Sequence, residues 1–160
     1  MKRTRLALPA TLDMAPNQQT GFLLQWAHQR AKNIFNAKLG PLRIETRHLG
    51  VLMLLAASPG LNQKEVVEQL ELDKSSVVLI LDDLERLGLA KRLPDPRDRR
   101  AHTLQITARG RARLTAAKRT AARLGRDIFA GLTSKQRRDL DRALARIITN
   151  CARLEERRAS

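Results

Sequence analysis

The sequence predicts a mainly α-helical protein that carries one small β-hairpin. Apolar residues recur at helical spacing along most of the 160 residues, whereas alternation with a period of two is confined to residues 89–93 and 103–107. Aromatic residues make up only 2% of the chain, so a core must be built from Leu, Ile, Val and Ala. A hydrophobic content of 42% is sufficient for that core. We therefore expect one domain of packed helices.

Two helices are expected in the first third of the chain. The first runs from about Asn17 to Leu39 and ends at a Gly-Pro pair. The second runs from about Thr46 to Ala57, is apolar around most of its girth and should be buried. Residues 1–16 hold three basic groups, two prolines and no periodicity. They are expected to form a flexible basic arm, either a disordered tail or an arm that enters a DNA minor groove.

Residues 61–88 predict two short helices joined by a tight turn. Asn62 and Glu65 have the spacing of a reciprocal cap at the start of the first helix, and Asp73 caps the second. Gly88 stands where a helix ends in a left-handed residue. The apolar positions of the second helix are Val77, Ile80, Leu81, Leu84 and Leu87.

A charged hairpin follows these helices. The two alternating segments, 89–93 and 103–107, flank the sequence PDPRDRR at residues 94–100, whose prolines and aspartates favour a turn. The order helix, turn, helix, hairpin is that of a winged helix-turn-helix. In such a unit the second helix enters the major groove of DNA and the hairpin, or wing, can reach the minor groove.

Two long helices are expected after the hairpin. Thr107 can cap the first, which should reach Ala130 and be closed by Gly131, and Thr133 with Gln136 can cap the second, which should run to about Arg157. The last helix carries an apolar stripe of Leu140, Leu144, Ile147, Ile148 and Leu154. The apolar faces of the flanking helices exceed what a small winged helix can bury.

Four segments, DKSSVV (73–78), DDLERLGLAKR (82–92), DPRDRRAHTLQIT (95–107) and ARG (108–110), resemble the MarR family of bacterial transcriptional regulators. The resemblance covers the whole DNA-binding lobe, and a generic winged-helix domain without a sensing role is the alternative. The resemblance to the MarR family implies a flexible arm over residues 1–16 and a single domain over residues 17–160. Within it, residues 46–107 would form the winged helix-turn-helix, and residues 17–45 and 108–160 would form dimerisation helices. A two-fold dimer matches a pseudo-palindromic operator with half-sites about 34–36 Å apart, or a multiple of it.

The net charge of +15 favours a polyanionic partner, because Lys and Arg displace condensed counterions from phosphates. Residues 1–60 have a balance of +6, residues 61–110 carry nine basic and nine acidic groups, and residues 111–160 have a balance of +9. The excess charge therefore lies on the flanking helices and can steer the protein to double-stranded DNA, while base reading must come from the central segment.

Candidate DNA contacts lie at the starts of the two central helices. Lys74, Ser75 and Ser76 stand at the amino end of the second, where they could serve as contacts to phosphate and bases or as ordinary capping residues. Many relatives carry a polar residue at position 79. Leu79 could only contact a thymine methyl group or turn inward. The residues expected to hold the phosphate backbone are Asn62, Gln63 and Lys64.

In the wing, the resemblance implies that Arg100 enters the minor groove while Asp98 braces its guanidinium group. A narrow A·T-rich groove would be preferred, because it concentrates negative potential. Arg97 and Arg99 are expected to contact phosphates. The alternative is a solvated charged turn.

The resemblance also implies a small phenolic or anionic effector bound between the dimer layer and the DNA-binding lobe. Candidate residues are Trp26, Arg30 and His48, which offer a flat apolar surface, a cation and a hydrogen-bonding ring. Each also has a structural explanation: Trp26 as core, Arg30 as a solvated side chain and His48 as a satisfied helix residue.

No cofactor, metal site or enzymatic motif is expected. His28, His48, His102 and Cys151 lack paired ligand spacing, and Cys151 lies in an apolar stretch typical of buried packing. There is no phosphate-binding glycine loop or nucleophile elbow. The longest apolar run, residues 49–57, is too short to span a membrane, and one cysteine fits a reducing compartment. We expect a soluble cytoplasmic protein at the bacterial nucleoid: a repressor, or alternatively a low-specificity nucleoid-type DNA-binding protein.

Overall fold

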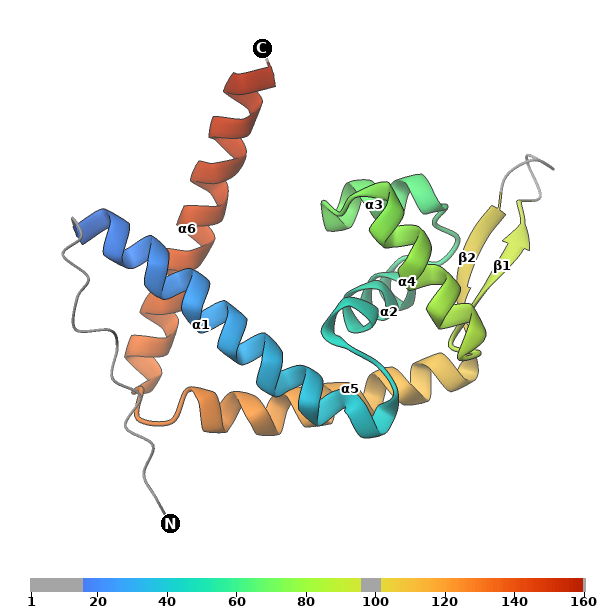
Figure 1. Ribbon diagram of the computed structural model, residues 1–160, viewed down its shortest axis with the longest axis horizontal. Helices are drawn as coiled ribbons and strands as arrows, with labels where there is room; N and C mark the ends of the chain where they lie inside the picture. Colours follow the sequence, from blue (N-terminus) through green and yellow to red (C-terminus); the bar gives the residue numbers. More distant parts are fainter. Residues whose placement is uncertain (1–15, 96–101, 160) are drawn as a thin grey trace. The chain divides into compact units, whose positions relative to one another are not determined.

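A computed structural model describes residues 16–95 and 102–159 and confirms the mainly helical chain with one hairpin (Figure 1). The elements in order are α1 (Pro16–Leu39), the 3-10 turn η1 (Gly40–Leu42), α2 (Thr46–Ala57), α3 (Gln63–Leu70), α4 (Lys74–Arg86), β1 (Ala90–Pro94), β2 (His102–Ile106), α5 (Ala108–Ile128) and α6 (Ser134–Ala159). The chain divides into two compact units, residues 1–120 and 121–160. None of the described helices combines the length and apolarity that crossing a membrane requires. The arm expected over residues 1–16 lies almost wholly outside the described residues.

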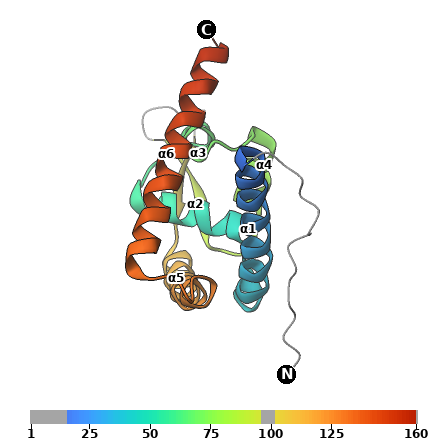
Figure 2. The same cartoon turned by 90° about the vertical axis from the view of Figure 1, so that its left-hand side faces the viewer.

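The core of the first unit is built around α2, as its apolar sequence predicts. Leu52 and Leu55 of α2 are fully buried, together with Leu81 and Leu84 of α4. Each such side chain stabilises the fold by roughly 1.5–3 kcal/mol relative to exposure. Figure 2 shows α2 running across the line of α1, and α2 also contacts α3, α4 and β2. The unit is therefore held together by one central helix that touches most of the others.

The predicted caps are present, because they depend only on nearby residues. The Glu65 amide donates to Asn62 Oδ1 at 3.0 Å while the Asn62 amide donates to Glu65 Oε2 at 2.7 Å. Thr133 and Gln136 exchange the equivalent pair of bonds at the start of α6. Asp73 caps α4. These bonds satisfy amide groups that the first turn of a helix leaves without partners.

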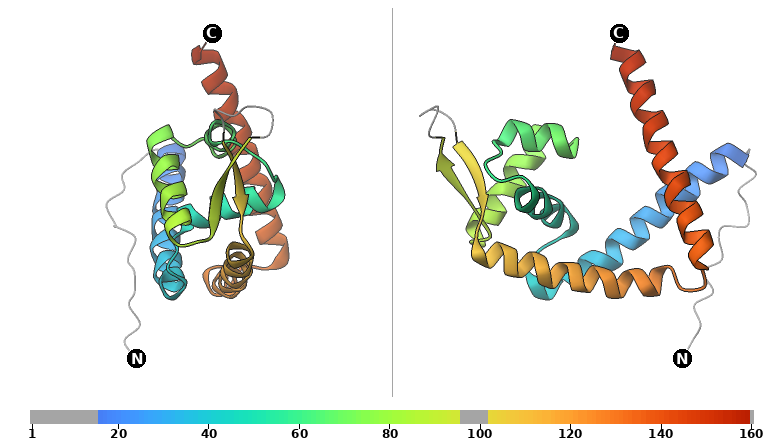
Figure 3. Two further views of the ribbon diagram at one scale, coloured as in Figure 1. Left: turned by 90° about the vertical axis from the view of Figure 1, so that its right-hand side faces the viewer. Right: turned by 180° about the vertical axis from the view of Figure 1, so that it is seen from behind.

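The hairpin pairs β1 and β2 antiparallel, from Ala90 opposite Ile106 to Pro94 opposite His102. In β2 the predicted alternation is clear, since Leu104 and Ile106 are buried and Gln105 is exposed. A further connection was not predicted: the Leu104 amide donates to the Leu61 carbonyl at 2.7 Å, which ties β2 to the segment before α3. The hairpin thus extends from the helical core and lies beside α4 (Figure 3).

The end of α5 differs slightly from its predicted position. The helix stops at Ile128 rather than Ala130, because the Ala130 amide bonds to the Asp127 carbonyl at 3.3 Å and so tightens the last turn. Gly131 follows with a φ of +90°, and Gly88 after α4 has a φ of +67°, as expected for residues that end helices.

In the second unit, α6 leaves most of its predicted apolar stripe uncovered. Ile148 is 69% exposed and Leu154 is 59% exposed, and Leu140 and Ile147 are also exposed. Cys151, which the sequence favours as a buried residue, is exposed too, because no other element of this unit covers that face. A contiguous exposed apolar face of this kind is typical of a surface that contacts another protein molecule.

Gly110 in the first turn of α5 has a packing role that its sequence context does not reveal. A Cβ atom at this position would lie 2.0 Å from the Leu89 carbonyl oxygen and 2.8 Å from Cγ1 of Ile106. Thr107 holds the same junction, since its hydroxyl donates to the Gly88 carbonyl at 2.8 Å and accepts from the Gly110 amide at 3.0 Å. Only glycine permits this approach of α5 to the start of β1.

Replacing Gly110 with Ala is therefore expected to lower the free energy of unfolding by about 3 kcal/mol, because the backbone of residue 89 must move. Gly50→Ala in α2 is the matched control, since a Cβ there meets nothing within 4 Å. That control should be stabilised by about 0.5–1 kcal/mol through lower chain entropy in the unfolded state. Urea unfolding of both variants provides the measurement, and equal midpoints would contradict the packing role of Gly110.

Candidate functional site

Apart from Leu79 and the residues of the wing, the predicted DNA contacts lie at the amino ends of α3 and α4, two helices that pack against each other (Figure 1). Lys64, Lys74 and Ser75 are exposed, and Gln63 and Ser76 are partly buried. Both helix starts face outward from the core with their cationic side chains in solvent. This arrangement suits an extended anion that runs past both ends.

Asp73 organises the amino end of α4. Its Oδ1 atom accepts the Ser75 hydroxyl at 2.5 Å and the Ser76 amide at 2.8 Å. These hydrogen bonds hold the pKa of Asp73 well below its ordinary value, and the bond from Ser75 has the largest effect. In this structure the Ser75 proton is therefore directed to Asp73, and Ser75 must turn away before it can donate to a phosphate.

At the start of α3, the residues predicted to contact DNA make different interactions with their neighbours. The Asn62 side-chain oxygen is engaged in the cap of α3. Lys64 lies 3.7 Å from Glu68 in an exposed pair one turn apart, an interaction worth only a few tenths of a kcal/mol. Lys64 can leave this pair at little cost, whereas Asn62 cannot leave the cap without exposing the Glu65 amide.

Leu79 is 60% exposed on α4, one turn beyond Ser75 and on the same face. The sequence left open whether this leucine turns inward, and in the structure it does not. It borders a shallow space of about 320 Å³ whose other lining residues are Thr46, Arg47, Gly50, Leu70, Leu72, Ser76 and Ile80.

A contact that the sequence did not predict joins β1, the first strand of the wing, to α4. The backbone amide of Arg92 in β1 donates to the Glu85 carboxylate at 2.8 Å. The Arg92 guanidinium group also pairs with Glu85, and its Nη2 atom lies 2.8 Å from Asp82. Partial burial opposes the charged form of Arg92, but the hydrogen bond that Arg92 donates to Asp82 and the charges of Glu85 and Asp82 raise its pKa overall. The alignment of β1 along α4 is thus set by one forked cation between two carboxylates.

The tip of the wing lies outside the described residues. Arg97, Asp98, Arg99 and Arg100 all fall in this segment, so their roles remain predictions.

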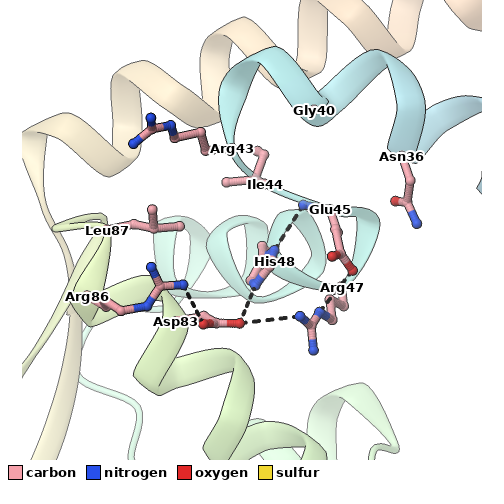
Figure 4. Close-up of a pocket in the computed structure, with 10 residues that line it drawn as sticks. All are labelled: Asn36, Gly40, Arg43, Ile44, Glu45, Arg47, His48, Asp83, Arg86 and Leu87. Carbon is pink, nitrogen blue, oxygen red and sulfur yellow. Dashed lines mark hydrogen bonds and ion pairs between the residues drawn. The ribbon is translucent and has the colours of Figure 1, made fainter.

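The structure separates the three predicted effector residues. On α1, the Arg30 guanidinium lies 4.9 Å from the centre of the Trp26 ring, which in turn packs against Phe22. His48 instead lines a cavity of about 530 Å³, and neither Trp26 nor Arg30 is among the lining residues. These are Asn36, Gly40, Arg43, Ile44, Glu45, Arg47, His48, Asp83, Arg86 and Leu87 (Figure 4).

Asp83 of α4 contacts three of the side chains that line this cavity. Its Oδ1 atom lies 2.8 Å from Arg86, and its Oδ2 atom lies 3.3 Å from Arg47 and 3.4 Å from Nε2 of His48. The hydrogen bond from Arg86, followed by that from His48, keeps the pKa of Asp83 below its ordinary value. Arg47 also pairs with Glu45, and Arg43 lines the cavity with its side chain directed away from both carboxylates (Figure 4).

Among the described residues, no group of three or more His, Cys, Asp or Glu side chains is arranged to hold a metal ion.

Comparison with known proteins identifies the family. The sequence model of the MarR family matches residues 44–101. The transcriptional repressor CouR, solved on a 23-mer DNA duplex, is 34% identical, with a TM-score of 0.72 over 85% of this chain and 94% of CouR. A MarR-family regulator from Rhodococcus sp. RHA1 is 29% identical, with a TM-score of 0.74 over 84% of this chain and 95% of that one. The chain belongs to the MarR family of transcriptional regulators.

Sequence relatives of this MarR-family chain are also regulators rather than enzymes. A Thauera aromatica protein named for transcriptional regulation of the hcr operon is 33% identical over 61% of this chain, and the match spans 59% of that relative's length. A helix-turn-helix transcriptional repressor of Mycobacterium tuberculosis is 26% identical over 85% of this chain and 98% of its own length. The family match begins at Ile44, beside the cavity, and runs through α4 into the wing.

Because Arg92 ties β1 to α4, Arg92→Ala is expected to lower the free energy of unfolding by about 1–2 kcal/mol. The loss should be smaller for Arg92→Lys, the matched control, because a lysine keeps the charge but cannot bridge both carboxylates in a fork. Urea unfolding followed by circular dichroism measures both. A lysine variant as unstable as the alanine variant would show that the charge alone contributes nothing.

Proposed function

We propose that this MarR-family chain is a homodimeric repressor that binds a pseudo-palindromic double-stranded DNA operator in the bacterial cytoplasm. The observation that carries the proposal is the pair of adjacent, outward-facing helix starts, with Lys64 and Lys74 exposed, beside a hairpin whose tip sequence is rich in arginine. The similarity to CouR, a repressor solved on DNA, and to the M. tuberculosis repressor supports the same function.

In this proposal α4 enters the major groove and each residue type has a distinct task. Lys64 and Lys74 pair with phosphates, and Gln63 and the serines hydrogen-bond to backbone or base edges. Leu79 contacts a thymine methyl group, the only base feature in the major groove that suits an alkyl side chain. The DNA-contact set is Asn62, Gln63, Lys64, Lys74, Ser75, Ser76 and Leu79, joined by Arg97, Asp98, Arg99 and Arg100 of the wing.

The dimer is supported by the uncovered apolar stripe of α6. Exposed leucines and isoleucines recur along about four turns of this helix, from Leu140 to Leu154. A second copy of the chain would remove them from water, with residues 17–45 and 108–160 as the dimerisation layer and 46–107 as the DNA-binding lobe. Two-fold symmetry then presents two copies of α4 to one face of the duplex.

We further propose that a small phenolic or carboxylate effector releases the protein from DNA by binding at the cavity beside His48. Three arginines line the cavity, and guanidinium binds carboxylate and phenolate oxygens strongly. The Trp26–Arg30 stack on α1 is the other candidate, since it pairs an aromatic face with a cation.

A low-specificity, nucleoid-type DNA-binding protein is the second candidate function. It is favoured by the net charge of +15 and by the exposed leucine at position 79, which offers no hydrogen bond to a base. Competition with random DNA separates the two functions, because an operator-specific repressor keeps a large affinity ratio and a nucleoid protein does not.

The experiment that tests the proposal is selection of bound sequences from a random DNA pool by the full chain. We expect an inverted repeat with half-sites about one helical turn apart, and sedimentation of the protein as two chains. Enrichment of no sequence, or a single chain in solution, would overturn it.

Arg100→Ala is expected to weaken operator binding by about 1–3 kcal/mol and to reduce its salt dependence, because the side chain is proposed to enter the minor groove. Arg138→Ala, an exposed arginine of α6 that is absent from the proposed DNA-contact set, is the matched control. Fluorescence anisotropy at fixed salt measures both. If the two variants bind the selected operator equally well, the wing has no such role.

If the cavity binds the effector, Arg43→Gln should raise the concentration of effector that releases DNA by about tenfold, through loss of one charge-assisted hydrogen bond. Arg30→Gln is the control that tests the Trp26 site by the same assay, a titration of the protein–operator complex with a panel of phenolic carboxylates. A larger effect at Arg30 than at Arg43 would move the site to α1.

A further inference from the structure

His48 is the one polar or charged side chain among the described residues that is fully buried, with 4% of its surface exposed. It lies in the first turn of α2, at the point where α2 meets α4 (Figure 4). The start of α2 is also fixed to α1, since the Thr46 amide and hydroxyl both donate to Asn36 Oδ1 at 2.8 Å. His48 therefore occupies the junction between a fixed helix start and the proposed reading helix.

The hydrogen bonds of the ring fix its protonation state. Nδ1 lies 2.9 Å from the Glu45 amide nitrogen, which can only donate, so Nδ1 must be the unprotonated acceptor. The ring proton then sits on Nε2, which lies 3.4 Å from Oδ2 of Asp83, an acceptor. Both contacts are satisfied by one species, the neutral ring with its proton on Nε2.

A proton on Nδ1 would place two donors against each other at the start of α2. The Glu45 amide would lose its acceptor, and the reciprocal cap that Glu45 and His48 form would be half broken. The charges of Asp83 and Glu45 favour the protonated form of the ring, and the charge of Arg47 opposes it. Arg43 and Arg86 also line the space around the ring. Burial acts most strongly and, despite the hydrogen bond with Asp83, lowers the pKa of His48 below its ordinary value of 6.5.

The connection to DNA binding runs through Asp83. This carboxylate lies one turn beyond Leu79 on α4, and α4 also carries Lys74 and Ser75 at its amino end. Loss of the bond from the Glu45 amide would displace the His48 ring and, through its contact with Asp83, the adjoining side of α4, and so alter the placement of the proposed contact residues.

We propose that His48 is a positioning residue that makes DNA binding sensitive to pH, because only its neutral ring can accept the Glu45 amide at the start of α2 while it donates to Asp83 of α4. The inference rests on the proposed DNA-binding function and adds a proton as a second signal. Since the folded protein disfavours the protonated ring, the competent state is fully present above about pH 6.5 and is lost as pH falls through the lower folded pKa. Below that pKa the operator affinity should fall by up to about tenfold per pH unit, in step with the competent fraction.

The test uses the full chain with its other two histidines replaced, His28→Gln and His102→Gln, so that His48 is the only imidazole left. Affinity for the selected operator is measured from about pH 7.5 to about pH 5.5 at fixed ionic strength. We expect it to fall with decreasing pH in this background and to stay flat when His48→Gln is added. Glutamine suits the third position of a reciprocal cap and does not titrate.

Nitrogen-15 NMR of the imidazole in the same background supplies a readout that a general loss of stability would not produce. At about pH 7.5 we expect an unprotonated Nδ1 and a protonated Nε2. The opposite tautomer, a charged ring, or an identical pH profile with and without His48 overturns the inference while leaving the proposed function intact. Failure to bind any operator at any pH overturns the proposed function, and this inference with it.

Discussion

The placement of α4 depends on carboxylates that the helix presents to its neighbours. Asp83 faces Arg47 and His48 of α2, while Asp82 and Glu85 hold Arg92 of β1. On its other side α4 buries Val77, Ile80, Leu81 and Leu84. Helix α4 is thus packed into the core along one face, and ionic contacts attach it to α2 and to β1 of the hairpin.

These two kinds of interaction contribute differently. The four buried side chains of α4 each supply roughly 1.5–3 kcal/mol, whereas a partly exposed ion pair supplies about 1 kcal/mol or less. Packing therefore accounts for most of the stability. Apolar contacts are non-directional, however, while guanidinium and imidazole groups bond only in certain geometries. The ionic contacts consequently decide how α4 is turned relative to α2 and β1, and this sets where Ser75 and Leu79 point.

The same arrangement joins the two sites that the proposed function requires. Arg47, His48 and Arg86 line the cavity and also contact Asp83 of α4. Any anion that draws Arg47 or Arg86 toward itself competes directly with this carboxylate. If α4 enters DNA as proposed, Asp83 would couple the cavity to that helix directly, without a long pathway between them. The Trp26–Arg30 stack has no described contact of this kind.

The sequence alone determined the features that depend on residues close together in the chain. The caps at Asn62, Asp73 and Thr133, the left-handed glycine after α4, the alternation of β2 and the family motifs could all be read from it, because each involves groups a few positions apart. Tertiary structure decided the rest. The fork of Arg92, the cavity around Asp83, the reason for Gly110 and the buried environment of His48 join residues from different elements. Their spacing along the chain carries no signal, since the contacts exist only after the apolar faces of α2, α4 and the hairpin have packed together.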